Sequence, residues 1–129
     1  MASRSPLALT PEMRELYKQF CAEMDKAGIS WITTCTRRTQ ADQDELYARG
    51  RSKPGQIVTW TRKSRHIDGE AFDICILKNG KLCWDISNGD WKKAGEIGRK
   101  LGLDWGGSWT RNKDFPHFQY IKPKTVEMI

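Results

Sequence analysis

Hydrophobic side chains recur every three or four residues in two stretches of the sequence, and this spacing predicts two amphipathic helices. The first helix is expected to begin at Pro11 behind a Thr10 cap and to end at Gly28. The second is expected to start from an Asp90 cap and to end at Gly102. The apolar positions are Met13, Leu16, Tyr17, Phe20 and Met24 in the first helix and Trp91, Ala94, Ile97 and Leu101 in the second.

A third, shorter helix is predicted from a capping box. The side chains of Thr39 and Asp42 stand three residues apart, and each can accept a hydrogen bond from the backbone N–H of the other. Gly50 is expected to end this helix. The side chains expected to share one of its faces are Gln43, Leu46 and Tyr47.

Short runs rich in β-branched and aromatic residues predict the strands. Asn79-Gly80 is typical of a tight hairpin turn and separates two of these runs. The polar residues 51–65 are expected to form a loop and Trp105-Gly106-Gly107 a turn. The expected strands are residues 29–35, 71–77, 81–84 and 118–121, followed by a polar tail over 122–129.

The order of these elements predicts the fold class. A hairpin takes the place of repeating βαβ units, so the sequence favours an α+β fold with an antiparallel sheet. The chain has 129 residues, of which 38% are hydrophobic and 29% charged, which suits one domain over residues 1–129. We therefore expect a small antiparallel sheet flanked by about three helices.

Composition and charge narrow the function classes. No apolar run approaches the ~20 residues that cross a bilayer. The first ten residues lack the apolar stretch of a signal peptide, so we expect synthesis and folding in the cytoplasm. Lys and Arg total 22 against 16 acidic residues, a net charge of +6, which favours an anionic partner. Nucleic acid is not expected, because no block of five like charges occurs.

The four cysteines do not predict a metal site. None forms a C-x-x-C pair, so neither a thiolate zinc site nor a redox centre is indicated. They are interpreted as small buried hydrophobic residues. The cysteines are Cys21, Cys35, Cys75 and Cys83.

Two histidines and one aspartate form the candidate metal site. His66 lies in a predicted loop, and Asp73 lies on the strand that follows it. Strand alternation places Asp73 on the face opposite Phe72. An acidic residue inside an otherwise apolar strand needs a partner, which a cation would supply. His117 begins the last predicted strand. Two imidazoles and one carboxylate are the ligand set of an open zinc site, although structural roles for all three remain open at this stage.

Two further residues are candidates for catalysis. Asp114 lies three residues before His117 and could move a proton between bound water and a leaving amine, or it could only cap a turn. Arg38 could stabilise a developing oxyanion or hold a substrate carboxylate, or it could be a solvated charge. Arg37 stands beside it, and the sequence leaves open which arginine contacts substrate.

Motifs spread over residues 32–121 resemble the zinc-dependent peptidoglycan peptidases, a group of D-alanyl-D-alanine carboxypeptidases and L-alanyl-D-glutamate peptidases. The likeness is greatest to short phage endolysins of the L-alanyl-D-glutamate type. The motifs are Thr-Arg-Arg-Thr at 36–39, Gln43, Leu46-Tyr47, Gly50-Arg51, Pro54-Gly55, Ile57-Val58-Thr59, S-x-H-x-x-G-x-A-x-D at 64–73, Trp105-Gly106-Gly107 and D-x-P-H-F at 114–118.

The resemblance implies a role for each of these residues. His66, Asp73 and His117 would hold one zinc ion at the face of the sheet. Asp114 would be the catalytic carboxylate and Arg38 would stabilise the tetrahedral intermediate. The residues implied to bind or support substrate are Arg38, Ser64 as a hydrogen-bond donor, and Gln43.

The resemblance also implies a substrate and a setting. The substrate would be the stem peptide of peptidoglycan in an anionic bacterial envelope, and the protein, a monomer, would cleave the L-alanyl-D-glutamate bond. As a phage lysin it would wait in the host cytoplasm until a holin released it to the cell wall. The alternatives are a D,D-carboxypeptidase or dipeptidase acting on D-Ala-D-Ala and a non-catalytic, zinc-stabilised module that binds the cell wall.

Overall fold

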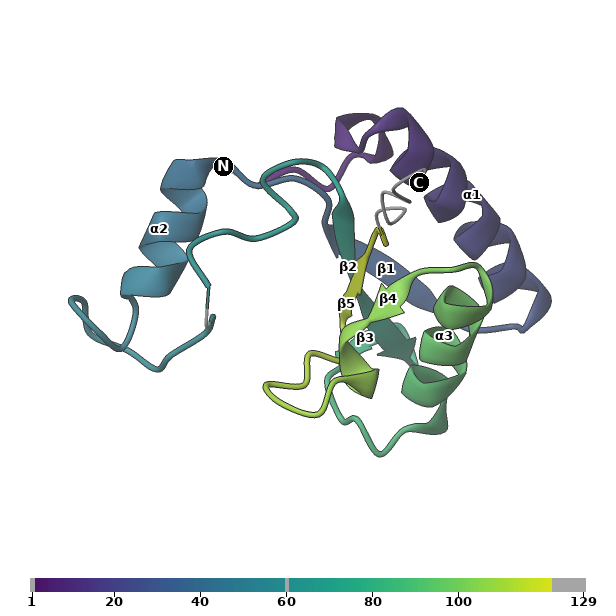
Figure 1. The fold of residues 1–129 in the computed structure, drawn as a ribbon. Helices are drawn as coiled ribbons and strands as arrows, with labels where there is room; N and C mark the ends of the chain where they lie inside the picture. The colour runs from purple at the N-terminus through teal and green to yellow at the C-terminus, as the bar shows by residue number, and fades with distance from the viewer. Residues whose placement is uncertain (1, 60, 122–129) are drawn as a thin grey trace, which may run out of the picture.

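An antiparallel sheet and three α-helices make up the fold (Figure 1). The structure is a computed structural model that describes residues 2–59 and 61–121, and the predicted tail over 122–129 lies outside them. The strand order is β1-β2-β5-β4, with β3 paired to β2 and all pairs antiparallel. The helices are α1 (Pro11–Lys26), α2 (Gln40–Ala48) and α3 (Gly89–Lys100), and the strands are β1 (Trp31–Cys35), β2 (Ala71–Lys78), β3 (Lys81–Cys83), β4 (Asp104–Trp105) and β5 (His117–Gln119).

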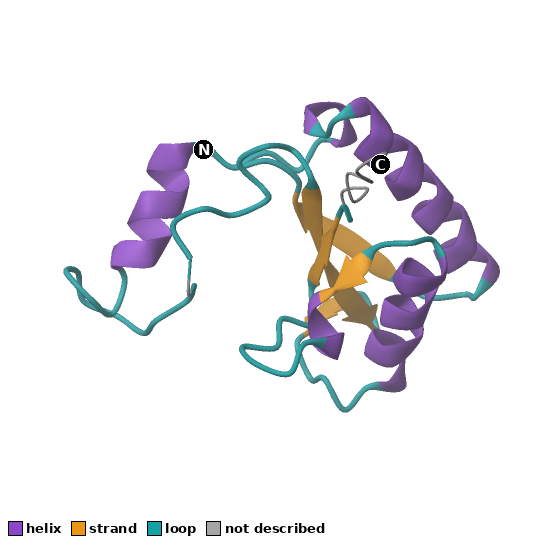
Figure 2. Ribbon diagram, in the orientation of Figure 1, coloured by secondary structure: helices purple, strands orange, loops and turns teal. Residues whose placement is uncertain are grey.

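Helices α1 and α3 lie together on one side of the sheet, and the core lies between them and the strands (Figure 2). Phe20 of α1 packs against Phe72 of β2 and Phe118 of β5, with ring centroids 5.2 and 5.0 Å away. Phe72, Ile74 and Ile76 are all fully buried, as expected for the apolar face of β2, and the neighbouring Ala71 and Cys75 are fully buried as well. Each aromatic pair adds about 0.5–1.5 kcal/mol beyond the area it buries.

Helix α2 stands away from the sheet on a projecting segment, residues 39–59 and 61–63, which we call the arm (Figure 1). The predicted capping box is present, since Thr39 Oγ1 accepts from the backbone of Asp42 and an Asp42 carboxylate oxygen accepts from the backbone of Thr39. The arm therefore has a defined start. It faces the side of the sheet that α1 and α3 leave open.

The α+β class and antiparallel sheet agree with the sequence, whereas several boundaries were wrong. Asn88, not Asp90, caps α3, because the side chain of Asn88 accepts from the backbone N–H of Asp90. Trp105 does not belong to a turn but to β4, where it pairs with Phe118. Strand β1 begins two residues later than expected, and β5 covers only His117–Gln119. A short 3-10 helix over Pro6–Ala8 and another over Gly106–Ser108 carried no periodic signal.

The burial predicted for the cysteines holds for two of the four. All four cysteines are free, with Cys35 and Cys75 buried and Cys21 and Cys83 half-buried. Among the described residues, no helix is both long and apolar enough to cross a membrane.

Candidate metal centre

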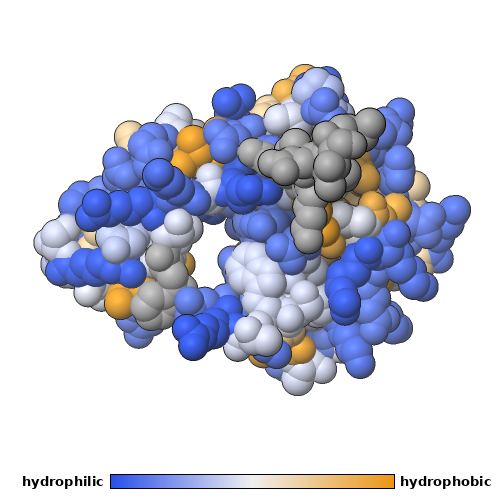
Figure 3. Space-filling model, in the orientation of Figure 1, coloured by the Kyte–Doolittle hydropathy of each residue, from blue (hydrophilic) through white to orange (hydrophobic). Residues whose placement is uncertain are grey.

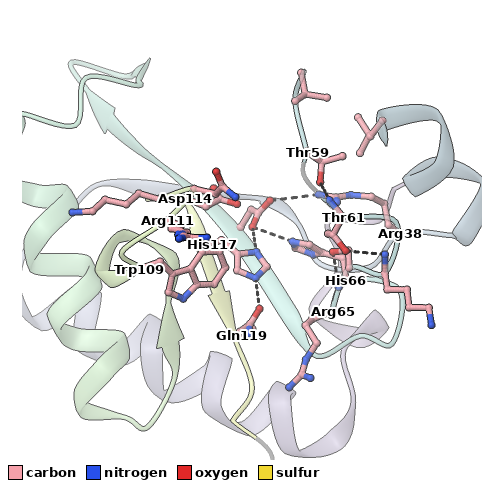
Figure 4. A pocket seen from close by; sticks show the side chains of 17 residues that line it. Arg38, Thr59, Thr61, Arg65, His66, Trp109, Arg111, Asp114, His117 and Gln119 are labelled. Atoms are coloured by element: carbon pink, nitrogen blue, oxygen red, sulfur yellow. Dashed lines mark hydrogen bonds and ion pairs between the residues drawn. The ribbon is translucent and has the colours of Figure 1, made fainter. Parts of the chain in front are cut away.

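His66, Asp73 and His117 come together on the open face of the sheet. Asp73 of β2 and His117 of β5 are direct partners in the antiparallel register, and His66 reaches them from the loop that precedes β2. One ligand atom from each residue lies within 4.8 Å of the other two. Figure 4 shows both imidazoles pointing into the same pocket. The backbone register thus fixes two of the three groups, and only His66 depends on a loop.

The hydrogen bonds of the two imidazoles define which nitrogens face one another. His66 Nε2 and His117 Nδ1 each lie 3.0 Å from Asp73 Oδ1. The other ring nitrogens face oxygens: His66 Nδ1 lies 3.2 Å from the carbonyl of Thr36, and His117 Nε2 lies 2.8 Å from Gln119 Oε1. A carbonyl oxygen only accepts, so in the neutral rings these outer nitrogens carry the hydrogen. The lone pairs of both imidazoles therefore point at the carboxylate.

Three acceptors that point at one another require a positive charge between them. Burial alone would lower the pKa of His66, but the charge of Asp73 and the hydrogen bond to it raise that pKa from 6.5 to about 10. When protons rather than a metal supply this charge, N–H groups of the imidazoles face the carboxylate instead of lone pairs. Burial would raise the pKa of Asp73, yet the charge of His66 and these hydrogen bonds then hold that pKa well below its usual range. Two nitrogens and one oxygen suit zinc with a fourth position left for water. The residues fit a divalent cation of this kind.

A pocket of about 580 Å³ opens over the three residues, between the arm and the sheet (Figures 3 and 4). Arg38 lines this pocket with a side chain that is only 15% exposed, and its Nη2 lies 3.6 Å from Asp73 Oδ2. Arg37 does not line it, because its Nε donates to the carbonyl of Ile67. Of the two adjacent arginines, Arg38 alone can therefore meet a molecule bound in the pocket.

Gln43 and Ser64 both lie beside the site, but only Ser64 lines the pocket. Gln43 is fully buried and does not line the pocket; its Oε1 accepts from Arg38 at 2.8 Å, and its Nε2 donates to the carbonyl of Thr61. It thus fixes Arg38 to the arm. Ser64 lines the pocket, and its hydroxyl accepts from the backbone N–H of His66, which leaves the hydroxyl hydrogen for the donor role that remains a prediction.

Asp114 lies at the rim of the same pocket. The residue is exposed, yet the surrounding protein displaces part of the hydration of its carboxylate, and this desolvation, with the charge of Asp73, raises its pKa. The backbone packs tightly there: Asp114 N donates to the carbonyl of Gly106, and a Cβ on Gly106 would stand 2.2 Å from the carbonyl oxygen of Asp114. A carboxylate with a raised pKa can both accept and return a proton.

Sequence reasoning missed three residues that support His117. The ring of Trp109 lies 5.5 Å from the imidazole, centroid to centroid, and Trp109 Nε1 donates to Asp104 Oδ1 at 2.9 Å. Gln119 shares the face of His117 on β5. The period of two along a strand could have placed Gln119 there, whereas Asp104 depends on a β4–β5 pairing that carried no signal.

Known proteins resemble this chain in sequence. A family described as D-alanyl-D-alanine carboxypeptidase matches residues 58–120. The peptidoglycan L-alanyl-D-glutamate endopeptidase CwlK of Bacillus subtilis is 38% identical over 126 residues, covering 90% of this chain and 75% of CwlK. The L-alanyl-D-glutamate peptidase of an Escherichia phage is 35% identical over 60% of this chain and 58% of its own length.

Solved structures share the fold. The L-Ala D-Glu endopeptidase ChiX of Serratia marcescens superposes with a TM-score of 0.70 at 22% identity, covering 94% of this chain and 89% of ChiX. The LD-carboxypeptidase LdcB superposes with the same TM-score at 19% identity, over 87% of this chain and 58% of LdcB. At these low sequence identities, the similarity shows only that the fold is shared.

Together these findings define the class: the protein is a peptidase of the kind that acts on peptidoglycan. The chain belongs to the family that joins the D-alanyl-D-alanine carboxypeptidases with the L-alanyl-D-glutamate peptidases. The expectation of an enzyme is thereby confirmed.

Proposed function

We propose that the protein is a zinc endopeptidase that hydrolyses the L-alanyl-D-glutamate bond of peptidoglycan stem peptides. The observation that carries this proposal is the convergence of His66, Asp73 and His117 in a pocket that also holds Asp114 and Arg38. The names of CwlK and of the phage relative support the choice of bond.

Each residue has a distinct task in this proposal. His66 Nε2, His117 Nδ1 and an Asp73 oxygen would hold the zinc, which when bound supplies a Lewis acid and a water of lowered pKa. Asp114 takes the proton of the attacking water and returns it to the leaving nitrogen. Arg38 donates to the oxygen that gains negative charge, and Gln43 keeps the guanidinium in place.

The charge of the pocket suits an anionic peptide. Lys63, Arg111 and Lys113 line the rim, and within the described part of the chain their charged ends form no hydrogen bond or ion pair; we call them the rim cations. Glutamate after the scissile bond has two carboxyl groups, of which only one continues the peptide. The second carboxylate is the group that we propose the rim cations recognise.

One digest tests the choice of bond. Purified sacculi treated with the zinc-loaded protein should release fragments that begin with glutamate at a new amino terminus, identified by mass spectrometry. Release of free D-alanine instead would support the second candidate, a D,D-carboxypeptidase, which the description of the matching family favours. Equal digestion by a metal-free preparation would exclude the zinc mechanism.

We further propose that the protein acts as a monomer in bacterial lysis and waits in the host cytoplasm until it is released to the wall. The phage relative supports this role. Cells that express the protein should stay intact until the inner membrane is permeabilised and should then lyse. An active-site variant such as Asp114→Asn is the control, and lysis that begins without permeabilisation would contradict the proposed setting.

A further inference from the structure

Asp104 occupies a place behind the metal centre that none of the proposed roles explains. It lies on β4, where it is the direct partner of Gln119 on β5, and it does not line the pocket. Its two carboxylate oxygens accept from different side chains: Oδ1 from Trp109 Nε1 at 2.9 Å and Oδ2 from Gln119 Nε2 at 3.1 Å. Asp104 therefore cannot touch a substrate, but it contacts two residues that surround His117.

These contacts determine the orientation of the Gln119 amide. An ionised carboxylate only accepts hydrogen bonds, so the NH₂ end of Gln119 must face Asp104. The opposite end, Oε1, then faces His117 Nε2 at 2.8 Å. The amide oxygen can only accept, so His117 must carry its hydrogen on Nε2. A neutral imidazole with hydrogen on Nε2 has its lone pair on Nδ1.

That lone pair points at the metal centre. His117 Nδ1 lies 3.0 Å from Asp73 Oδ1, within the group of three ligand atoms. A reversed Gln119 would present its NH₂ to Nε2, and the imidazole would then carry its hydrogen on Nδ1, where the metal must bind. The choice between the two tautomers thus depends on the negative charge of Asp104, two hydrogen bonds away.

We propose that Asp104 is a positioning residue that, through Gln119, fixes His117 as a metal ligand by way of Nδ1. The indole of Trp109 completes the arrangement, because it holds the other oxygen of Asp104 and packs on the imidazole of His117. This inference rests on the metal site of the proposed function. It assigns the ligand atom and identifies what selects it.

Zinc affinity of the purified full chain is the measurement, made by competition with a chromophoric chelator. Asp104→Asn lets the Gln119 amide reverse, and outer partners of metal-bound histidines typically change affinity by about 10-fold to 100-fold. Gln119→Leu removes the link and should weaken zinc binding by a similar factor. In the Gln119→Leu background, Asp104→Asn should then cause no further loss, since the two side chains act in series.

A reversed pair provides the rescue. In Asp104→Asn combined with Gln119→Glu, the new amide can donate to the new carboxylate, which still accepts from His117 Nε2. Zinc affinity should return to within about threefold of the unaltered protein, and nitrogen-15 spectra of the zinc-loaded protein should assign the metal to Nδ1 of His117 in both. This rescue separates positioning from a simple loss of folding.

The possible failures point to different conclusions. Unchanged zinc affinity in Asp104→Asn, or an equal further loss in the Gln119→Leu background, would overturn the positioning role and leave the proposed function intact. The second result would mean that the charge of Asp104 acts directly through space. If the unaltered protein bound no zinc, the proposed function and the positioning role would both fail.

Discussion

Asp73 and His117 face each other across the β2–β5 pair, and Oδ1 of the first lies 3.0 Å from Nδ1 of the second. Their approach is set by the sheet register rather than by a flexible loop. Phe72 and Phe118, the next pair along, stack at 5.3 Å on the opposite, helix-covered face. The same two strands therefore anchor the core with one face and carry two of the three ligand groups on the other.

Ligand variants and a variant of the proposed acid–base residue should fail in different ways. His66→Ala removes one nitrogen and should lose both bound zinc and turnover. Asp114→Asn keeps the size of the side chain, so it should retain zinc while activity falls by about 100-fold to 10,000-fold, the range of general acid–base catalysis. Elemental analysis and a peptide hydrolysis assay measure the two quantities. Equal zinc loss in both variants would contradict the division of roles.

Adjacent arginines offer a matched comparison. Arg38→Lys keeps the charge but loses the planar fork that reaches both Gln43 and Asp73, so kcat should fall by about 100-fold, as for an oxyanion donor. Arg37→Lys, directed away from the pocket, should stay within about threefold of the unaltered protein in the same hydrolysis assay. A larger loss in Arg37→Lys than in Arg38→Lys would show that the wrong arginine was assigned to substrate.

Local sequence signals predicted much of this fold because each depended on neighbours in the chain. The capping box at Thr39 and the apolar face of β2 needed only residues a few positions apart; the capping box is present, and Phe72, Ile74 and Ile76 are buried. Asn88 was missed because Asn and Asp are both good caps and stand two residues apart. Strand β4 was missed because two residues give no periodicity.

For the site, the sequence predicted the metal-binding residues from their residue types but not the contacts that support them. Two histidines and an aspartate on a strand pointed to a cation, and the structure brings these residues together. The arrangement of Gln119 and Asp104 could not be predicted, since it depends on the pairing of two strands that are too short to show a periodic pattern. The separation of α2 from the sheet was also not predicted, although Gln40–Ala48 has few large apolar side chains and its one buried residue is Gln43.

Gly106 should be essential for the position of Asp114. A methyl group there would meet the carbonyl oxygen of Asp114 at 2.2 Å, so Gly106→Ala must displace the rim that carries the carboxylate. We expect a cost of about 1–3 kcal/mol in stability and a loss of kcat of at least about tenfold, with zinc retained. Gly89→Ala, where nothing lies within 4 Å, is the control for both thermal unfolding and hydrolysis. Full activity in Gly106→Ala would contradict this account.

Removal of the metal should lower the thermal stability of the protein without unfolding it. In the metal-free site, protonated His66 and ionised Asp73 form an ion pair that supplies the missing positive charge. Zinc at 100 times its Kd stabilises the folded state by about 2.7 kcal/mol, so a chelator should lower Tm by several degrees. Calorimetry with and without chelator measures the shift. A random-coil circular dichroism spectrum after chelation would contradict the expectation, whereas restored zinc should restore Tm.

The rim cations should select a free carboxylate beside the scissile bond. Two synthetic stem peptides that differ only in the second glutamate carboxyl, free or amidated, separate this effect from peptide binding in general. Changing Arg111 and Lys113 together to Gln should raise KM for the free acid by about tenfold, roughly 1.4 kcal/mol, and leave the amidated peptide unaffected. Changing Lys92 and Lys93 together to Gln, at two exposed positions of α3, removes the same charge away from the pocket and is the matched control. Added salt should reduce the difference in KM between the free-acid and the amidated peptide, because salt screens exposed charges. If the unaltered protein hydrolysed both peptides with equal KM, the rim cations would have no part in substrate choice.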